Sequence, residues 1–250
     1  MTAFTKMEGL GNDFIVLEGP KDLDPSEVAF WSDRRRGIGA DGVLVVTPKN
    51  GRISMEVFNA DGSRAELSGN GLRCAARYAA DRELAPAAGL VVETLAGSHQ
   101  VARLASGEYR AELGRVKLTG ERQLAGRIVH TASIGNPHAV VLVGDPEEED
   151  VAVVGPEIAS EFEGGVNVGF LAVERHDRLR LRVYERGAGE TLACGTGAAA
   201  AHALAVDRDM ADSPAVVSLR GGDLIVEIDA GTTWITGPAR YVFEGSWGLR

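Results

Sequence analysis

The sequence has very few cysteines and no long apolar run. Two cysteines among 250 residues cannot supply the disulfide framework of a small secreted protein, so a reducing cytoplasm is expected. No stretch approaches the roughly 20 apolar residues that a membrane-spanning helix needs. Residues 1–14 also lack the apolar core of a secretory signal. The sequence therefore predicts a cytoplasmic protein with no membrane partner.

Positive charge is also scarce, with 26 Lys and Arg against 36 Asp and Glu and a formal net charge of −10. Such a chain repels nucleic acids and anionic membranes, so neither is expected as a partner. The densest basic run, residues 34–36, follows Asp33 and is interpreted as a solvated helix end. A P-loop is absent, and no lysine lies in a glycine-rich phosphate cup where pyridoxal phosphate could bind. The sequence therefore predicts no cofactor and no metal.

Short apolar segments bounded by Gly, Asp, Asn or Pro predict many strands. They are residues 14–17, 42–47, 53–58, 90–93, 139–143, 179–184, 215–219, 224–228 and 241–244. Two alanine-rich segments, 71–84 and 197–206, predict helices instead. The second is apolar on every side and should be buried.

The two predicted helices belong to an internal repeat. Each follows a strand, a polar turn, and then a small residue, glycine, a polar residue and glycine. The first copy runs through 58–63 to 68–71, and the second runs through 184–187 to 194–197. This repeat predicts an α+β fold of two similar domains, each with one helix against a curved sheet. The boundary is expected between residues 113 and 129.

The turn Cys194-Gly195-Thr196-Gly197 opens the second helix. Unpaired N–H groups and the helix dipole attract an anion there, and they are expected to lower the pKa of Cys194. The first half carries Ser68 at the matching position. If both helix ends hold one carboxylate, the two residues flank its α-carbon, and the N–H groups stabilise the enediolate that forms on proton removal. A structural cysteine in an ordinary glycine-rich turn is the alternative that these residues alone leave open.

Further motifs in a fixed order carry a resemblance to a known family. They include residues 7–14, 37–42, 58–63, 135–138, 166–170, 184–191, 193–197 and 236–240. Together they resemble the diaminopimelate epimerases. The resemblance implies a pyridoxal-phosphate-independent isomerase that interconverts LL- and meso-diaminopimelate for lysine and peptidoglycan biosynthesis. It also implies two α/β-roll domains, 1–115 with 238–250 and 116–237, with the active site in the cleft between them. A homodimer is compatible with it.

The resemblance also implies roles for individual residues. Cys194 and Ser68 would be the acid/base pair. The distal amino-acid group of the substrate would be held by Asn12, Asn59, Asn136, Asn167 and Arg186. Glu185 and His138 would lie beside the reacting α-amino group. The backbone of Gly69, Asn70, Gly195 and Thr196 would surround the reacting carboxylate. Turn formation is the alternative for the asparagines, and a core position is the alternative for His138.

The chain departs from the family pattern at Ser68, where the family carries its first catalytic cysteine. Cys74 lies more than one helical turn further on and is interpreted as a core residue. Gly42 is a lesser departure, because some members carry glutamine there. Since a hydroxyl is a poor base, three alternatives remain open. The protein could epimerise another amino acid, eliminate water from a hydroxylated substrate, or bind a ligand without catalysis.

Overall fold

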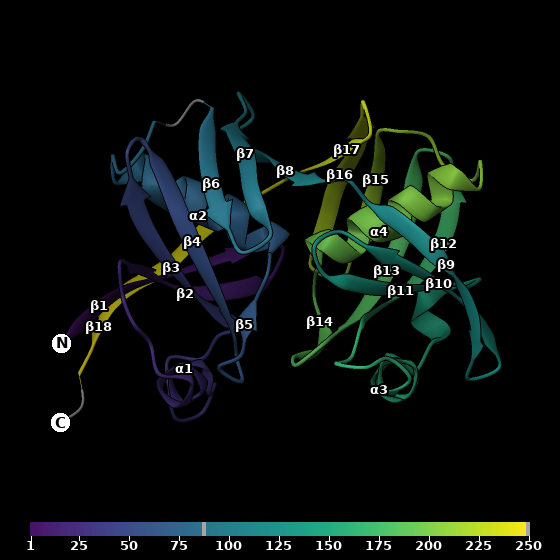
Figure 1. Ribbon diagram of the computed structural model, residues 1–250, viewed down its shortest axis with the longest axis horizontal. Coiled ribbons are helices and arrows are strands. Elements are labelled where there is room, and N and C mark those ends of the chain that lie inside the picture. Colours follow the sequence, from purple (N-terminus) through teal and green to yellow (C-terminus); the bar gives the residue numbers. More distant parts are fainter. Residues whose placement is uncertain (87–88, 249–250) are drawn as a thin grey trace. The chain divides into compact units, whose positions relative to one another are not determined.

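A computed structural model describes residues 1–86 and 89–248 and has an α+β fold (Figure 1). The chain forms two compact units. The first contains Met1–Ala111 and the stretch that begins at Gly237, and the second contains Glu112–Thr236. Among the described residues, no helix is both long and apolar enough to cross a membrane.

The first unit contains one sheet with the strand order β18-β1-β2-β3-β4-β6-β7-β8. Neighbouring strands are antiparallel except for β2–β3 and β4–β6, which are parallel. Helix α1 lies in the first parallel crossover, and the short strand β5 and helix α2 lie in the second. The bounds are β1 Thr2–Gly9, β2 Asn12–Glu18, α1 Pro25–Ser32, β3 Gly42–Lys49, β4 Arg52–Asn59, β5 Arg64–Ala65, α2 Gly69–Asp81, β6 Leu90–Thr94, β7 Gly97–Arg103, β8 Tyr109–Gly114 and β18 Arg240–Trp247.

The second unit repeats this topology with the order β9-β10-β11-β12-β13-β15-β16-β17. Its parallel pairs are β11–β12 and β13–β15, and helices α3 and α4 lie in their crossovers. The bounds are β9 Lys117–Leu124, β10 Arg127–Ser133, β11 Pro137–Leu142, the 3₁₀ turn η1 Pro146–Glu148, α3 Val151–Ser160, β12 Asn167–Arg175, β13 Arg178–Glu185, β14 Gly189–Thr191, α4 Gly195–Asp207, β15 Ala215–Leu219, β16 Gly222–Asp229 and β17 Thr232–Gly237. The repeat seen in the sequence is therefore a repeat of a whole fold.

Each sheet is covered by a helix on both faces, as the first unit illustrates. Val43 and Val45 of β3 belong to the apolar cluster that includes Val28 and Trp31 of α1. Leu44, the residue between them, points to the other face, where its side chain lies against the first turn of α2. A strand that is buried on both faces is apolar at every position. This explains why the central strands appear in the sequence as unbroken apolar runs.

Both predicted helices are present, and each begins at the first glycine of its turn. Helix α2 starts at Gly69 and helix α4 at Gly195, directly after the caps Ser68 and Cys194. The prediction that the second helix is buried on all sides is also confirmed, because every residue from Gly195 to Ala205 is buried.

Helices α1 and α3 were not predicted. Helix α1 has only eight residues, capped by the Asp24 side chain, which is too short for a clear periodicity. Helix α3 contains Gly155 and Pro156, two residues that usually argue against a helix. Gly155 is required by packing, since an added Cβ would come within 2.6 Å of the Tyr184 side chain. Contacts made after folding thus decide a helix that local preference disfavours.

Candidate active site

Cys194 caps the N-terminus of α4 with its sulfur. The Gly197 N–H donates to Sγ at 3.3 Å, and the Thr196 hydroxyl lies 3.5 Å from the same sulfur. Cys194 is only 3% exposed. A larger residue at position 197 would crowd the sulfur, because an added Cβ would lie 3.3 Å from it. The first turn of α4 therefore offers two donors to a thiolate.

The pKa of the Cys194 thiol lies well above its ordinary value, chiefly because the group is buried. The nearby Glu185 carboxylate raises this pKa further, both through its charge and by accepting a hydrogen bond from the thiol. The donors Thr196 and Gly197 act in the opposite direction but do not outweigh burial. The expectation that the helix N-terminus lowers the thiol pKa is therefore wrong, because desolvation dominates here.

Two further predicted residues form a buried group with Thr196. The Asn136 Nδ2 group donates to Thr196 Oγ1 at 3.3 Å, and His138 Nε2 lies 3.0 Å from Asn136 Oδ1. All three side chains are at most 9% exposed. Burial lowers the pKa of His138 to about 3, and the positive charge of Arg186 contributes. His138 is therefore neutral at physiological pH.

The remaining predicted residues of the second unit lie at the ends of neighbouring strands. Asn167 begins β12 and is paired with His138 in the parallel ladder. The Asn167 amide donates to the Pro137 carbonyl at 3.2 Å and accepts from the Arg186 N–H at 3.0 Å. Glu185 ends β13, and its carboxylate accepts a hydrogen bond from the Thr191 hydroxyl of β14. The second unit thus brings its predicted residues together around the first turn of α4.

Ser68 occupies the matching position in the first unit. Its hydroxyl oxygen accepts from the Gly71 N–H at 3.0 Å and so caps α2 as Cys194 caps α4. An added Cβ on Gly71 would lie 3.1 Å from this oxygen, the same constraint as at Gly197. Ser68 is half-buried. The two helices therefore begin with the same geometry but with a different capping atom.

A chain of amide contacts connects the first turn of α2 to β2. The Asn70 amide donates to Asn12 Oδ1 at 3.2 Å, and the Asn12 amide donates to Asp41 Oδ2 at 3.0 Å. The buried Arg73 guanidinium donates to Asn70 Oδ1 at 2.7 Å. Asp41 also accepts from Arg34 at 2.7 Å. Asp41 and Arg73 were not among the predicted residues, although they fix the orientation of two asparagines that were.

Asn59 lies apart from this chain of contacts. It ends β4, pairs with Gly42 in the ladder, and donates to Ser63 Oγ at 2.9 Å within its own turn. This hydrogen bond fits the turn interpretation of Asn59. Gly42 also pairs with Phe14 of β2. Asn59 therefore lies at the same end of the sheet as Asn12, which begins β2.

Cys74 is a core residue, as predicted. Its side chain is 0% exposed in the middle of α2, and burial raises the pKa of its thiol to about 12. Both cysteines are free thiols. Within 1–86 and 89–248, no group of three or more His, Cys, Asp or Glu is placed to hold a metal ion.

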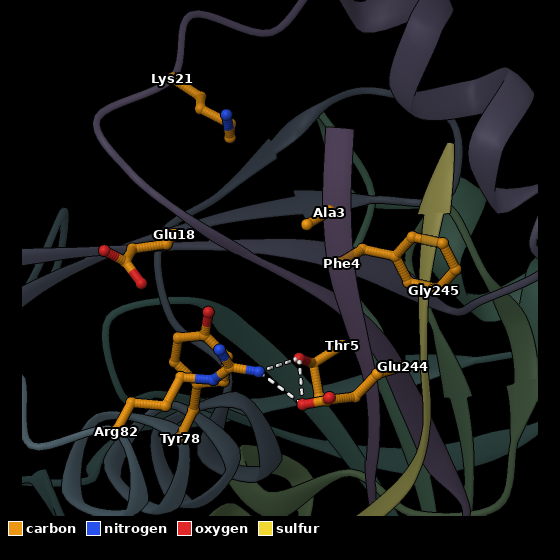
Figure 2. Close-up of a pocket in the computed structure, with 9 residues that line it drawn as sticks. All are labelled: Ala3, Phe4, Thr5, Glu18, Lys21, Tyr78, Arg82, Glu244 and Gly245. Carbon is orange, nitrogen blue, oxygen red and sulfur yellow. Dashed lines mark hydrogen bonds and ion pairs between the residues drawn. The ribbon is translucent and has the colours of Figure 1, made fainter. Parts of the chain in front are cut away.

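A cavity of about 310 Å³ lies at the other end of α2 (Figure 2). The Arg82 guanidinium donates to the Thr5 hydroxyl and the Glu244 carboxylate, and it stacks over the Tyr78 ring. Ser68 begins this helix and Arg82 ends it, so at 1.5 Å per residue the cavity is about 20 Å away from Ser68. Arg82, Thr5 and Glu244 bind one another at this cavity, which indicates that these contacts fasten β18 to α2.

Acid is expected to destabilise the fold between pH 6.5 and about 4.5. Burial lowers the pKa of His138 and of His202, both of which would titrate near 6.5 in the unfolded chain. The unfolded state therefore binds more protons in this interval, and stability present above pH 6.5 is lost as the pH falls. The expected loss is about 1.4 kcal/mol per pH unit from His138, and His202, whose pKa is also lowered, adds to it. Urea unfolding across this interval measures it.

Single substitutions separate the histidines from the carboxylates. His138→Gln and His202→Gln should each reduce the slope, whereas His176→Gln, at an exposed position, should preserve it. Asp13, whose pKa is lowered to about 2 by its bonds to Arg34 and Lys6 despite partial burial, contributes only below about pH 4. A free energy of unfolding that stays constant down to about pH 4.5 would contradict the expectation.

Comparison with solved structures identifies the fold. The chain resembles a hydroxyproline epimerase from Agrobacterium vitis with a TM-score of 0.77 and 16% sequence identity, over 98% of this chain and 91% of that one. It also resembles a phenazine biosynthesis protein from Bacillus anthracis with a TM-score of 0.75 and 16% identity, over 99% of both chains. At this identity the likeness establishes a shared two-domain α+β fold.

Sequence relatives are much closer. The chain is 42% identical to the diaminopimelate epimerase of Alkalilimnicola ehrlichii over 97% of each protein. It is 41% identical to that of Halorhodospira halophila, over 97% of this chain and 93% of the relative. The family model described as diaminopimelate epimerase matches residues 4–119 and 130–242. This chain therefore belongs to the diaminopimelate epimerase family.

Proposed function

We propose that this protein interconverts LL- and meso-diaminopimelate by removing and replacing an α-proton, a step in lysine biosynthesis. The observation that carries the proposal is family membership over nearly the whole chain, at about 40% identity to relatives of that name. The surroundings of Cys194 support it, because they combine a thiol with a carboxylate that can accept its proton and with two donors that can stabilise the thiolate. The protein is accordingly an isomerase, and its two free thiols suit the reducing cytoplasm.

Cys194 is the base in this proposal. Its thiol passes its proton to the Glu185 carboxylate, to which it is hydrogen-bonded. The resulting thiolate takes the α-proton of the substrate, and the electron pair of the broken C–H bond moves onto the substrate carboxylate as an enediolate. The Gly197 N–H and the Thr196 hydroxyl lie within hydrogen-bonding distance of the sulfur. They stabilise the thiolate while it exists.

The high pKa of Cys194 fits this role. The α-proton of an amino acid is very weakly acidic, so a base that holds its proton firmly has the greater driving force for removing it. A buried thiol whose proton acceptor is already in place ionises only when that acceptor takes the proton. Glu185 is oriented for this by the Thr191 hydroxyl.

The enediolate requires donors that are in place before it forms. The first turns of α2 and α4 each present N–H groups that are not used inside the helix. We propose that both act on the reacting carboxylate, through the backbone of Gly69, Asn70, Gly195 and Thr196. In this proposal Ser68 delivers the new proton to the α-carbon and regains one from water, and Glu185 releases to water the proton that it took from Cys194. The hydroxyl relays this proton because it ionises far less readily than a thiol.

The distal amino-acid group needs its own contacts. Arg186 supplies a positive charge for the carboxylate, and Asn12, Asn59, Asn136 and Asn167 supply amides. The internal contacts described above keep several of these amides in one orientation. A substrate with a single amino-acid group would leave this set unused, which favours diaminopimelate over other amino acids. A homodimer is the assembly expected from the family.

Incubation with LL-diaminopimelate in heavy water tests the proposal. Deuterium should enter the α-carbon, and meso-diaminopimelate should accumulate, without any added cofactor. Mass spectrometry measures the first result and chiral chromatography the second. Ser68→Ala should slow the reaction about 10²-fold, the lower range for loss of a general acid, and Ser68→Cys should match or exceed the original rate.

Ser68 is also the observation that favours a second candidate function, since a hydroxyl in place of one cysteine weakens two-sided proton exchange. A panel of other amino acids and hydroxylated substrates, run in the same assay, separates the possibilities. Deuterium exchange confined to another amino acid would make the protein an epimerase of that compound. Loss of water from a hydroxylated substrate, without exchange into diaminopimelate, would make it a hydro-lyase.

A further inference from the structure

A row of three buried side chains leads to the Cys194 sulfur from β11. His138 Nε2 lies 3.0 Å from Asn136 Oδ1, Asn136 Nδ2 lies 3.3 Å from Thr196 Oγ1, and Thr196 Oγ1 lies 3.5 Å from Cys194 Sγ. Their exposed fractions are 2% for His138, 9% for Asn136 and 3% for Thr196. Water can compete little for these contacts, so the row has a stable hydrogen-bond direction.

The direction follows from what each atom can do. An amide oxygen only accepts, so the hydrogen between the first two residues belongs to His138 Nε2. An amide nitrogen only donates, so Thr196 Oγ1 accepts from Asn136. A hydroxyl has a single hydrogen, and with Asn136 already donating to its oxygen, that hydrogen is available to the sulfur. Every hydrogen in the row therefore points toward Cys194.

We propose that Thr196 is a positioning residue that stabilises the Cys194 thiolate through its hydroxyl, and that Asn136 and His138 hold this hydroxyl in the donating direction. This inference rests on the proposed role of Cys194 as the base. Through Thr196, His138 and Asn136 would then influence the ionisation of the Cys194 thiol, although His138 makes no contact with the sulfur. The hydrogen bond acts mainly on the thiolate, since donors bind a negative sulfur more strongly than a neutral one.

The charged groups near the row act in a consistent way. Glu185 on β13 is the charged group whose carboxylate bears on Cys194, and it favours the protonated thiol. Arg186 bears on His138 and, with burial, keeps the imidazole neutral. A neutral imidazole has one N–H group, which the row places on Nε2. The Thr196 hydroxyl thus favours the thiolate of Cys194, whereas the Glu185 carboxylate favours the protonated thiol.

The first unit is built differently at the matching position. Asn70 follows Ser68 by two residues, as Thr196 follows Cys194. The Asn70 amide donates to Asn12 and accepts from Arg73. A threonine hydroxyl therefore accompanies the capping cysteine, whereas the residue at the matching position of the first unit is an asparagine. The serine, which relays a proton without a lasting charge, is capped by the Gly71 N–H.

Alkylation of Cys194 tests the inference without any substrate. Iodoacetamide reacts with the thiolate, so at a fixed pH below the thiol pKa its rate follows the thiolate fraction. The assay uses the Cys74→Ala background, which leaves one thiol. Thr196→Val keeps the side-chain shape but removes the hydroxyl, and it should slow alkylation about tenfold, the effect of losing one hydrogen bond to a charged group. Thr196→Ser restores a hydroxyl and should restore most of the rate.

A second pair of variants tests the row at a distance. His138→Leu removes the donor to Asn136 and should slow alkylation several-fold, whereas His138→Gln keeps an N–H donor and should preserve the rate. Thermal melting identifies any variant that fails to fold. If one variant does not fold, the pair of variants at the other residue tests the inference. An unchanged or faster alkylation in both Thr196→Val and His138→Leu would overturn the inference. If the variants change the alkylation rate as expected but diaminopimelate shows no deuterium exchange, the proposed function alone would be overturned.

Discussion

Cys194→Ala is expected to abolish measurable deuterium exchange into the α-carbon, with a loss of about 10³-fold or more. The variant lacks the only sulfur at a described helix N-terminus. Loss of a general base typically costs 10²- to 10⁴-fold, and the Glu185 carboxylate would lose the thiol from which it accepts a proton. The rate of deuterium incorporation from heavy water, followed by mass spectrometry, measures the effect.

Cys74→Ala is the matched control, since it removes the other thiol. Cys74 is completely buried in the middle of α2, so no substrate should reach its thiol. The variant should lose about 1 to 2 kcal/mol of stability through the small cavity and retain most of its activity. An inactive Cys74→Ala protein that is folded, together with an active Cys194→Ala protein, would reverse the assignment of the base.

Nine of the described strands and the two long helices could be predicted because their signals are local, whereas the sequence did not predict β1, β5, β7, β8, β9, β10, β12, β14 and β17. Apolar runs such as 14–17 and 42–47 are long enough to identify strands that are covered on both faces. Ser68 and Cys194, each followed by glycine, mark helix starts that the structure reproduces. Helix α3 could not be predicted, because a glycine at position 155 argues against a helix in the sequence. Only the folded chain shows that this glycine makes room for the Tyr184 side chain of β13.

The site was predictable only where a motif carried it. The caps, Glu185 and the asparagines were predicted as site residues because they belong to ordered motifs. Asp41 and Arg73 escaped notice because their roles depend on contacts with Asn12 and Asn70 that only the folded chain creates. The direction of the Cys194 pKa was wrong for a related reason. A helix N-terminus is visible in a sequence, whereas the depth at which it is buried is not.

Arg73→Met is expected to lower the free energy of unfolding by about 3 kcal/mol. The Arg73 side chain is 0% exposed and donates to three oxygens of the first unit. They are Pro238 O at 3.1 Å, Gly69 O at 3.2 Å and Asn70 Oδ1 at 2.7 Å. Methionine would fill much of the volume but remove these three donated hydrogen bonds, at about 1 kcal/mol each. Urea unfolding at neutral pH measures the loss.

An opposing effect limits the size of this loss. Burial lowers the pKa of Arg73 to about 10, which shows that the guanidinium remains charged at neutral pH but is costly to bury. Removing the charge relieves that cost, so a net loss of stability requires the three lost hydrogen bonds to outweigh it.

Arg77→Met is the matched control one turn further along α2. Arg77 is 30% exposed in its side chain and also donates to a carbonyl, Ala239 O at 2.6 Å. It should lose about 1 kcal/mol, since water can replace part of that contact. A stabilised Arg73→Met protein would mean that desolvation of the cation dominates, and the Arg73 contacts would then serve mainly to orient Asn70 at the start of α2.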